Sequence, residues 1–348
     1  MRLVLCTSAA LLLAVSVSYA QQVPQSDSSV IDADGTAHVT RVVPVPATLS
    51  PEAQAVLRRQ ISDAAVPQTL QQRRERTDAW QLGAGEASRK VYPVDEQTSS
   101  IAGVPVRIFT PQDAQPMHPQ SVLINLHGGG FNSDSGSFTE SIPICNLTHT
   151  RVVSVLYRLA PENPFPASVD DVVAVYRELL KSYRPAHIAI YGTSAGAILT
   201  GEVAVRFKQL GLPQPAALGI FSATGDFARA GDSTALFSLQ GLAGHLEPPS
   251  GKPDIREYSA KTDPRDPVLS PVYADLHGLP PTLFLTSTRD MLLSGTVNLQ
   301  RRFLEDGVDT RMVVFDGLAH AFWNDVALPE SRETYRIIAD FMAQHVNR

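Results

Sequence analysis

Three polar residues in the second half of the chain have the types and the order that cleavage of an acyl bond by serine needs: Ser194, Asp290 and His320. In that chemistry the serine hydroxyl attacks, a base takes its proton, and an acid orients the base. Ser194 lies in Gly-Thr-Ser-Ala-Gly, where an apolar run turns straight into a segment of helical character. A serine on so sharp a turn needs small neighbours, so the pattern is typical of a nucleophile. A glycine-rich turn with a solvated serine would look the same, so other parts of the chain must decide.

The acid and the base are each predicted just after an apolar run. Asp290 ends "PTLFLTSTRD", which places it at the carboxyl edge of a sheet, where active sites of open α/β sheets gather. A helix-capping role is the alternative for Asp290, and Asp316 after "MVVF" is the second candidate acid. His320 follows the last expected strand, on a loop that could place its imidazole over the sheet edge. Four other histidines fit less well, because they lie in polar segments, at a strand start or in the terminal helix: His38, His118, His187 and His345.

A glycine-rich turn in "NLHGGGF" is the candidate source of hydrogen-bond donors for the oxyanion. Backbone amides of Gly128, Gly129 and Gly130 can point at a substrate oxygen without side-chain obstruction, and we favour the last two. The amide of Ala195, next after the serine, would complete the oxyanion hole. Such turns also cradle phosphates, but this one lacks the lysine and the glycine spacing of the phosphate-binding motifs. His127 is expected to brace the loop and not to act as a second base.

The elements that must position these residues form an alternating pattern from about residue 89 onwards. Two segments, "RKVYPVD" and "VPVRIFTP", are predicted to form a β-hairpin, and the continuous apolar runs behind them are typical of strands covered on both faces. Strands that alternate with helices imply right-handed crossovers and a mostly parallel central sheet flanked by helices. The expected helices are "SVDDVVAVYRELLKSY", "AGAILTGEVAVRFKQLG", "GTVNLQRRFLEDG" and "SRETYRIIADFMAQH".

Residues 21–90 are predicted to form an N-terminal arm and cap helices. The start of this stretch is polar, proline-rich and extended, and a helix with Ser50 as its N-cap should follow over 50–65. Residues 91–348 are predicted to form the catalytic domain. Its loop-rich segment 222–275 is the expected cap insertion.

The first 20 residues, "MRLVLCTSAALLLAVSVSYA", have the pattern of a secretory signal peptide that is cleaved after Ala20. The mature chain would be secreted or periplasmic, without stable membrane insertion, because the apolar run is too short and too interrupted for a retained span. Cleavage would remove Cys6 and leave Cys145 as a lone thiol, which we expect to be buried.

The overall composition is that of a globular protein. Of 348 residues, 43% are hydrophobic and 18% charged, and the formal net charge is -6. This length is enough for one large α/β domain with a substantial core. The negative charge argues against a nucleic-acid partner, which would need clustered Lys and Arg.

Four motifs together resemble the hormone-sensitive-lipase-like family of α/β-hydrolases, in particular its bacterial esterases: "HGGGF", "YRLAPENPFPASVDD", "GTSAG" and "HAFW". The resemblance runs from about residue 95 to the end. It implies an α/β-hydrolase fold with a helical cap, and a serine carboxylesterase with Ser194, Asp290 and His320 as its triad. It implies no metal and no organic cofactor, a small-molecule ester as substrate, and a homodimer as one state frequent among similar esterases.

The chain departs from the family pattern at two places. Thr193 stands where the family often has aspartate, and this change is expected to affect local pH behaviour or loop packing. The segment after Asp290 reads "DMLLSGT" and lacks the second carboxylate that the family often carries, which makes Asp290 the weakest assignment of the three.

Three functions stay open on the sequence. The first is hydrolysis of short-chain acyl esters, favoured because the cap segments are not markedly apolar. The second keeps the enzyme but gives it acetylated carbohydrate or an amide as substrate. The third is a non-catalytic ligand-binding protein on the same fold, against which the presence of both Ser194 and His320 argues.

Overall fold

The computed structural model describes residues 28–40, 42–58, 69–112, 119–236 and 256–346, in two compact units that span Met1–Pro44 and Val45–Arg348. In the first unit, strands β1 (Ser28–Ile31) and β2 (Ala37–Thr40) pair antiparallel. The sequence predicted only an extended arm here and missed this hairpin, whose turn uses Gly35 at a φ of 88°. The predicted signal peptide, residues 1–20, lies outside the described residues.

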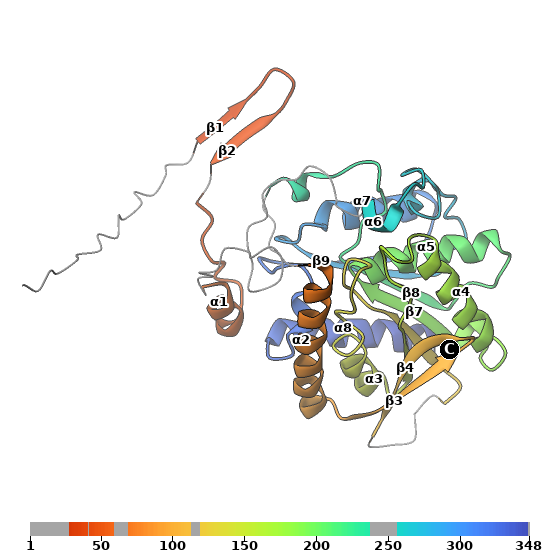
Figure 1. The fold of residues 1–348 in the computed structure, drawn as a ribbon. Helices are drawn as coiled ribbons and strands as arrows, with labels where there is room; N and C mark the ends of the chain where they lie inside the picture. The colour runs from red at the N-terminus through yellow and green to blue at the C-terminus, as the bar shows by residue number, and fades with distance from the viewer. Residues whose placement is uncertain (1–27, 41, 59–68, 113–118, 237–255, 347–348) are drawn as a thin grey trace, which may run out of the picture. The chain divides into compact units, whose positions relative to one another are not determined.

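The second unit is built on an eight-stranded sheet (Figure 1), in the order β10-β9-β8-β7-β5-β6-β4-β3. Only β4 runs against its neighbours, so the mostly parallel sheet predicted from the sequence is confirmed. The predicted hairpin is confirmed as the pairing of β3 with β4. The strands are β3 (Val94–Ile101), β4 (Val104–Pro111), β5 (Val122–Leu126), β6 (Arg151–Val155), β7 (Ile188–Thr193), β8 (Ala217–Phe221), β9 (Thr282–Ser287) and β10 (Thr310–Phe315).

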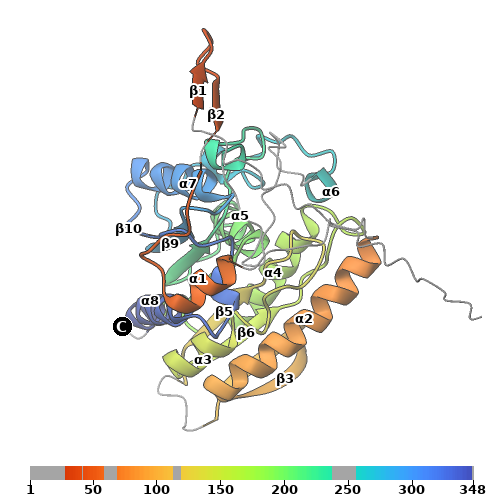
Figure 2. The same ribbon diagram turned by 90° about the vertical axis from the view of Figure 1, so that its left-hand side faces the viewer.

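Helices cover both faces of the sheet (Figures 1 and 2), and each face has its own apolar core. Along β5, Ile124 faces the core under α4, α5 and α7, whereas Leu123 faces the core under α3 and α8, because successive strand side chains alternate. None of the described helices is long and apolar enough to cross a bilayer. The α-helices are α1 (Pro51–Leu57), α2 (Leu70–Val91), α3 (Ile142–Thr148), α4 (Ala167–Leu179), α5 (Ala195–Gln209), α6 (Arg256–Ser259), α7 (Leu293–Glu305) and α8 (Pro329–Val346).

The N-terminal part of this unit corrects one expectation. Residues 89–91, predicted to begin a strand, are the last turn of α2, where Arg89 and Lys90 favour the carboxyl end of a helix. Helix α2 starts at a capping box formed by Thr69 and Gln72 and runs beside α3 (Figure 2). Helix α3 is too short to show a clear helical period in the sequence. Helix α1 has the predicted Ser50 N-cap, and residues 59–68 of the expected helix lie outside the described residues.

Cys145 lies in α3 as a free, fully buried cysteine, as predicted. Burial raises the pKa of its thiol to about 12. The thiolate is the reactive form of cysteine, and with this pKa Cys145 stays a neutral thiol at neutral pH. It therefore packs as a small apolar side chain.

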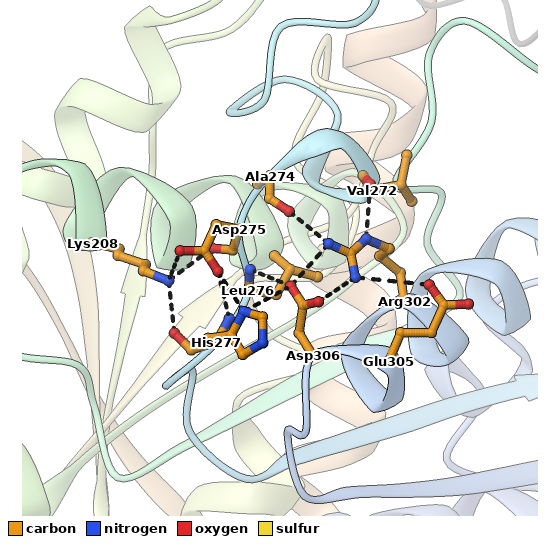
Figure 3. A network of polar contacts seen from close by, with 9 residues as sticks. All are labelled: Lys208, Val272, Ala274, Asp275, Leu276, His277, Arg302, Glu305 and Asp306. Atoms are coloured by element: carbon orange, nitrogen blue, oxygen red, sulfur yellow. Dashed lines mark hydrogen bonds and ion pairs between the residues drawn. The ribbon is translucent and has the colours of Figure 1, made fainter.

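A network of ion pairs joins α5, the segment 272–277 and α7 (Figure 3). Lys208 Nζ lies 2.8 Å from Asp275 Oδ2, and Arg302 Nη2 lies 2.9 Å from Asp306 Oδ2. His277 Nδ1 stands between the two carboxylates, 2.7 Å from Asp275 Oδ1 and 3.6 Å from Asp306 Oδ2. Asp275, His277 and Asp306 are close enough for a metal site, but both carboxylates already bond to a cation. The cluster therefore acts as a structural tie.

Arg302→Met is expected to lower the free energy of unfolding by about 2 kcal/mol at neutral pH, since it removes charged hydrogen bonds to a buried carboxylate. The hydrogen bond from Arg302 holds the pKa of Asp306 below its usual value of 3.8. This stabilisation is present above that value and is lost as the pH falls through the lower folded-state value. Urea unfolding at neutral pH and near pH 3 should show the difference between parent and variant shrinking.

Arg301→Met is the matched control for this prediction. Arg301 lies on the same helix and has no ion pair in the described part of the chain. Its replacement should change the free energy of unfolding by less than about 0.5 kcal/mol. Equal effects of the two substitutions would contradict a specific role of the Arg302–Asp306 pair.

Candidate active site

Ser194 stands between the end of β7 and the start of α5, in a backbone conformation that residues with a side chain rarely adopt. Its φ is 57° and its ψ is -121°, and its N–H donates to the carbonyl of Phe221. A Cβ at Gly196 would lie 1.7 Å from the carbonyl oxygen of Leu126, and one at Gly192 would lie 2.4 Å from the same oxygen. Both glycines are thus needed for the strand and the helix to approach each other, as the sequence pattern predicted.

The imidazole of His320 lies between the serine and the carboxylate. Its Nε2 is 2.9 Å from Ser194 Oγ, and its Nδ1 is 2.9 Å from Asp290 Oδ1. With a proton on Nδ1 donated to the carboxylate, Nε2 presents a lone pair to the serine hydroxyl. The structure therefore brings together the three residues that the sequence singled out, from three separate loops at one edge of the sheet.

Asp290 is buried, and several donors surround its carboxylate. The hydroxyl of Ser222 donates to Oδ2, as does that of Thr286 at 3.1 Å, and the N–H of Leu292 donates to Oδ1 at 2.8 Å. Burial acts to raise the pKa of Asp290, but the His320 ring and these donors outweigh it and hold the pKa below its ordinary value. Two hydroxyl groups and a backbone amide thus surround Asp290, which has no second carboxylate after it in the sequence of the kind that the family often carries.

The position of Asp290 differs slightly from the expectation, and the second candidate acid lies elsewhere. Strand β9 ends at Ser287, and Asp290 follows in a turn closed by a bond from its N–H to the Ser287 carbonyl. Asp316 accepts from the hydroxyls of Thr48 at 2.5 Å and Thr288 at 3.2 Å. The structure therefore pairs His320 with Asp290 and gives Asp316 other partners.

The glycine turn presents two free amides, and one of the three predicted donors is already used. The N–H of Gly128 donates to Glu140 Oε1 at 3.2 Å, which removes it from the set of oxyanion donors. Gly129 and Gly130 have φ values of 119° and 61°, at which a residue with a side chain would be strained. Within the described residues, the amides of Gly129, Gly130 and Ala195 have no acceptor, so these three are the candidate donors.

His127, His187 and His345 have structural partners. His127 stacks on Tyr157 with ring centroids 4.2 Å apart, and its Nδ1 lies 2.8 Å from the carbonyl of Gly128. His187 and His345 each place Nδ1 within hydrogen-bond distance of a carbonyl in α8. His127 therefore braces the glycine turn as expected, His187 ties the segment before β7 to the end of α8, and His345 bonds within α8. His118 lies outside the described residues.

Thr193 connects the nucleophile's strand to the loop that carries the base. Its hydroxyl accepts from the indole N–H of Trp323 at 3.0 Å, and both residues are buried. Trp323 follows His320 by three residues, so this bond fixes the two loops against each other. The expectation that Thr193 affects loop packing is consistent with this contact.

Arg74 is a contributor that no sequence pattern reveals. From α2, its Nε donates to the carbonyl of Asn132 at 2.6 Å and its Nη2 to that of Ala160 at 2.9 Å, and it pairs with Glu162. These bonds tie α2 to the residue after the glycine turn and to the segment after β6. Local spacing does not mark the residue, because its partners lie 58 to 88 positions away in the sequence.

Several known proteins are similar to this chain in sequence. The family described as the alpha/beta hydrolase fold matches residues 123–324. Among curated relatives, an acetyl-hydrolase of Streptomyces hygroscopicus is 31% identical over 63% of this chain and 74% of its own length. An esterase of Acinetobacter venetianus is 29% identical over the same shares.

Solved structures of esterases are similar to this chain over a larger share of its length. An esterase with 30% identity superimposes with a TM-score of 0.76, covering 88% of this chain and 97% of its own. An esterase from the bacterial hormone-sensitive lipase family, 29% identical, gives a TM-score of 0.72 over 85% of this chain and 99% of its own. This chain belongs to the α/β-hydrolase family, within its bacterial hormone-sensitive-lipase-like branch.

Proposed function

We propose that this protein is a serine carboxylesterase with Ser194 as nucleophile, His320 as base and Asp290 as orienting acid. The observation that carries the proposal is the single imidazole that bridges Ser194 Oγ and Asp290 Oδ1, at 2.9 Å on each side. The esterase and acetyl-hydrolase relatives support the reaction type. A ligand-binding protein would have no need of a base aligned in this way.

The reaction proceeds in two halves. Ser194 Oγ attacks the ester carbonyl carbon while His320 Nε2 takes its proton, and the oxyanion that forms faces the amides of Gly129, Gly130 and Ala195. The alcohol then leaves with the proton from Nε2, and an acyl-serine remains. Water gives a proton to His320 and attacks the acyl carbon. The bond from that carbon to Ser194 Oγ then breaks, His320 returns the proton to Oγ, and the carboxylic acid leaves the free serine behind. Asp290 stays ionised throughout and stabilises the imidazolium.

We further propose short-chain acyl esters as substrates. Helix α2, which lies against the segment after the glycine turn, is strongly polar, with "LQQRRERTD" in its first turns. A polar wall of this kind does not suit a long acyl chain, which needs apolar cover.

A chain-length series tests the substrate class. The parent protein should hydrolyse p-nitrophenyl acetate and butyrate at least tenfold faster, by kcat/KM, than p-nitrophenyl dodecanoate, a difference of about 1.4 kcal/mol or more in transition-state binding. Release of acetate from acetylated xylan, compared with release from the aryl ester, distinguishes the carbohydrate alternative from hydrolysis of simple esters. A preference for the dodecanoate would contradict the short-chain assignment, and faster release from xylan would favour the carbohydrate alternative.

A further inference from the structure

Glu140 is a carboxyl group buried directly behind the glycine turn, and the triad does not use it. In the sequence it lies between β5 and α3, and its side chain contacts Gly128 and Asn125. Oε1 accepts from the N–H of Gly128 at 3.2 Å, and Oε2 accepts from Nδ2 of Asn125, at the end of β5, at 3.0 Å. Tyr191, in the strand that leads to the nucleophile, donates its hydroxyl to the backbone carbonyl of the same residue at 3.1 Å. Glu140 thus joins the turn to both strands that flank the site.

The surroundings leave this carboxyl no room to move. A Cβ at Gly136 would lie 1.8 Å from Oε1, so only glycine lets the turn close over the group. The backbone is held as well, because the hydroxyl of Tyr191 donates to the carbonyl of Glu140 at 3.1 Å. The carboxyl is therefore a fixed support on which Gly128 rests.

The charge state of Glu140 follows from its position. Burial raises its pKa to about 8, although the hydrogen bonds from Asn125 and Gly128 oppose the shift, and nearby Asp134 adds to it. The acid form is consequently the main one at neutral pH. The other ionisable groups that face it come from the turn, β7, α8 and the segment after β6: Asp134, His127, Tyr191, Tyr335 and Tyr157.

We propose that Glu140 is a positioning residue of the oxyanion hole: its carboxyl holds the Gly128 amide so that the amides of Gly129 and Gly130 face the reacting ester. The inference rests on the proposed esterase function. Two observations support it. The bond to Glu140 is the reason that the Gly128 amide is not available to the oxyanion, and the Glu140 backbone is tied by Tyr191 to the strand that leads to the nucleophile.

A charge on this group would oppose the reaction. The oxyanion forms beside the amides that follow Gly128, so an ionised Glu140 would place a second negative charge behind them, in a site with little water to screen it. The turnover number of the parent should therefore fall by about tenfold between roughly pH 7.5 and 9.5. The KM should change little, because the neutral substrate binds before the charge develops.

Two substitutions separate positioning from mere space filling. Glu140→Gln copies the neutral acid and cannot ionise. Asn125 can turn its amide over to meet it, because its partner Ser154 can either donate or accept. Glu140→Asp keeps a carboxyl that is too short to reach Gly128. Glu202→Gln is the control, since Glu202 is also fully buried with a raised pKa but bonds to Tyr258.

The experiment measures kcat and KM for p-nitrophenyl acetate from about pH 6 to 9.5, corrected for spontaneous hydrolysis, with thermal unfolding of each variant as a folding check. We expect E140Q to keep kcat at pH 7 within about threefold of the parent and to lose the alkaline fall. E202Q should retain that fall. E140D should lower kcat by about tenfold at unchanged KM.

The outcomes distinguish this inference from the proposed function. An alkaline fall in E140Q equal to that of the parent would overturn the role of Glu140, as would a kcat of E140D equal to the parent's. If E140Q does not fold, E140D decides alone. A parent that hydrolyses no ester, or a Ser194→Ala variant as active as the parent, would instead refute the esterase function itself.

Discussion

Ser194→Ala is expected to lower kcat/KM for p-nitrophenyl acetate by about 10^4-fold or more, because the acyl-enzyme cannot form and only binding and the oxyanion amides remain. The fold should persist, since the Ser194 hydroxyl bonds only to His320 in the described structure. Steady-state hydrolysis of parent and variant, with circular dichroism as the folding control, provides the measurement. A variant within tenfold of the parent would show that another residue attacks the ester.

The same position allows a stability comparison that reports on the strain of the turn. Ser194 has a φ of 57° and a ψ of -121°, a region that glycine enters without a steric cost. Ser194→Gly should thus be as inactive as Ser194→Ala but more stable by about 1–2 kcal/mol in urea unfolding. Equal stabilities would mean that the turn relaxes in the variants and that the serine is not held under strain.

Asp290→Asn is expected to lower kcat by about 10^4-fold, the second-largest effect, because an amide cannot hold His320 in the tautomer that accepts the serine proton. The donors around Asp290 orient the native carboxylate, and an amide in its place carries no charge. Parent and variant should therefore also differ in the pH dependence of kcat. The assay is the pH profile of p-nitrophenyl acetate hydrolysis.

Asp316→Asn is the matched control for the acid. Both residues are aspartates that follow a strand of the same sheet, but Asp316 bonds to Thr48 and Thr288. Its replacement should leave kcat within about threefold of the parent. If D316N lost activity and D290N kept it, the bond between His320 and Asp290 would not be the functional one.

Local patterns in the sequence were enough to predict the architecture and the three residues that meet at the sheet edge. The continuous apolar runs predicted the buried strands because a strand covered on both faces has no polar side to show. The serine turn was recognised because it follows such a strand, β7, and the histidine loop because it follows the shorter apolar run of the edge strand β10. The carboxyl ends of parallel strands meet at one edge, so Ser194, Asp290 and His320 could be expected to lie close together from the order of the elements alone.

What the sequence did not predict depends on contacts between distant parts of the chain. The bond between Gly128 and Glu140, which removes one of three equivalent glycines from the oxyanion donors, follows from how the turn closes over a carboxyl 12 residues away. The donors to Asp290 come from the residue after β8, from β9 and from the turn after β9. The sequence next to Asp290 therefore could not show what replaces the second carboxylate. Arg74 likewise shows its role only through carbonyls on another segment.

The fold produces the chemistry by fixing three short loops against one another. Glycines at 192 and 196 let the nucleophile's turn approach β5, and the Trp323–Thr193 bond joins that turn to the loop with His320. Arg74 and Glu140 hold the glycine turn from two sides. Each loop is thus tied by at least one buried or charged hydrogen bond, which is what keeps donors and nucleophile in register.

Labelling with a fluorophosphonate, followed by intact-mass spectrometry and peptide mapping, tests the central claim most directly. The reagent reacts only with a serine whose hydroxyl is activated by a base, and its adduct reports the site without knowledge of the natural ester. The account predicts one adduct on the parent, on the peptide that contains Ser194, and none on Ser194→Ala. An adduct on another serine, or no adduct on a folded parent, would contradict it.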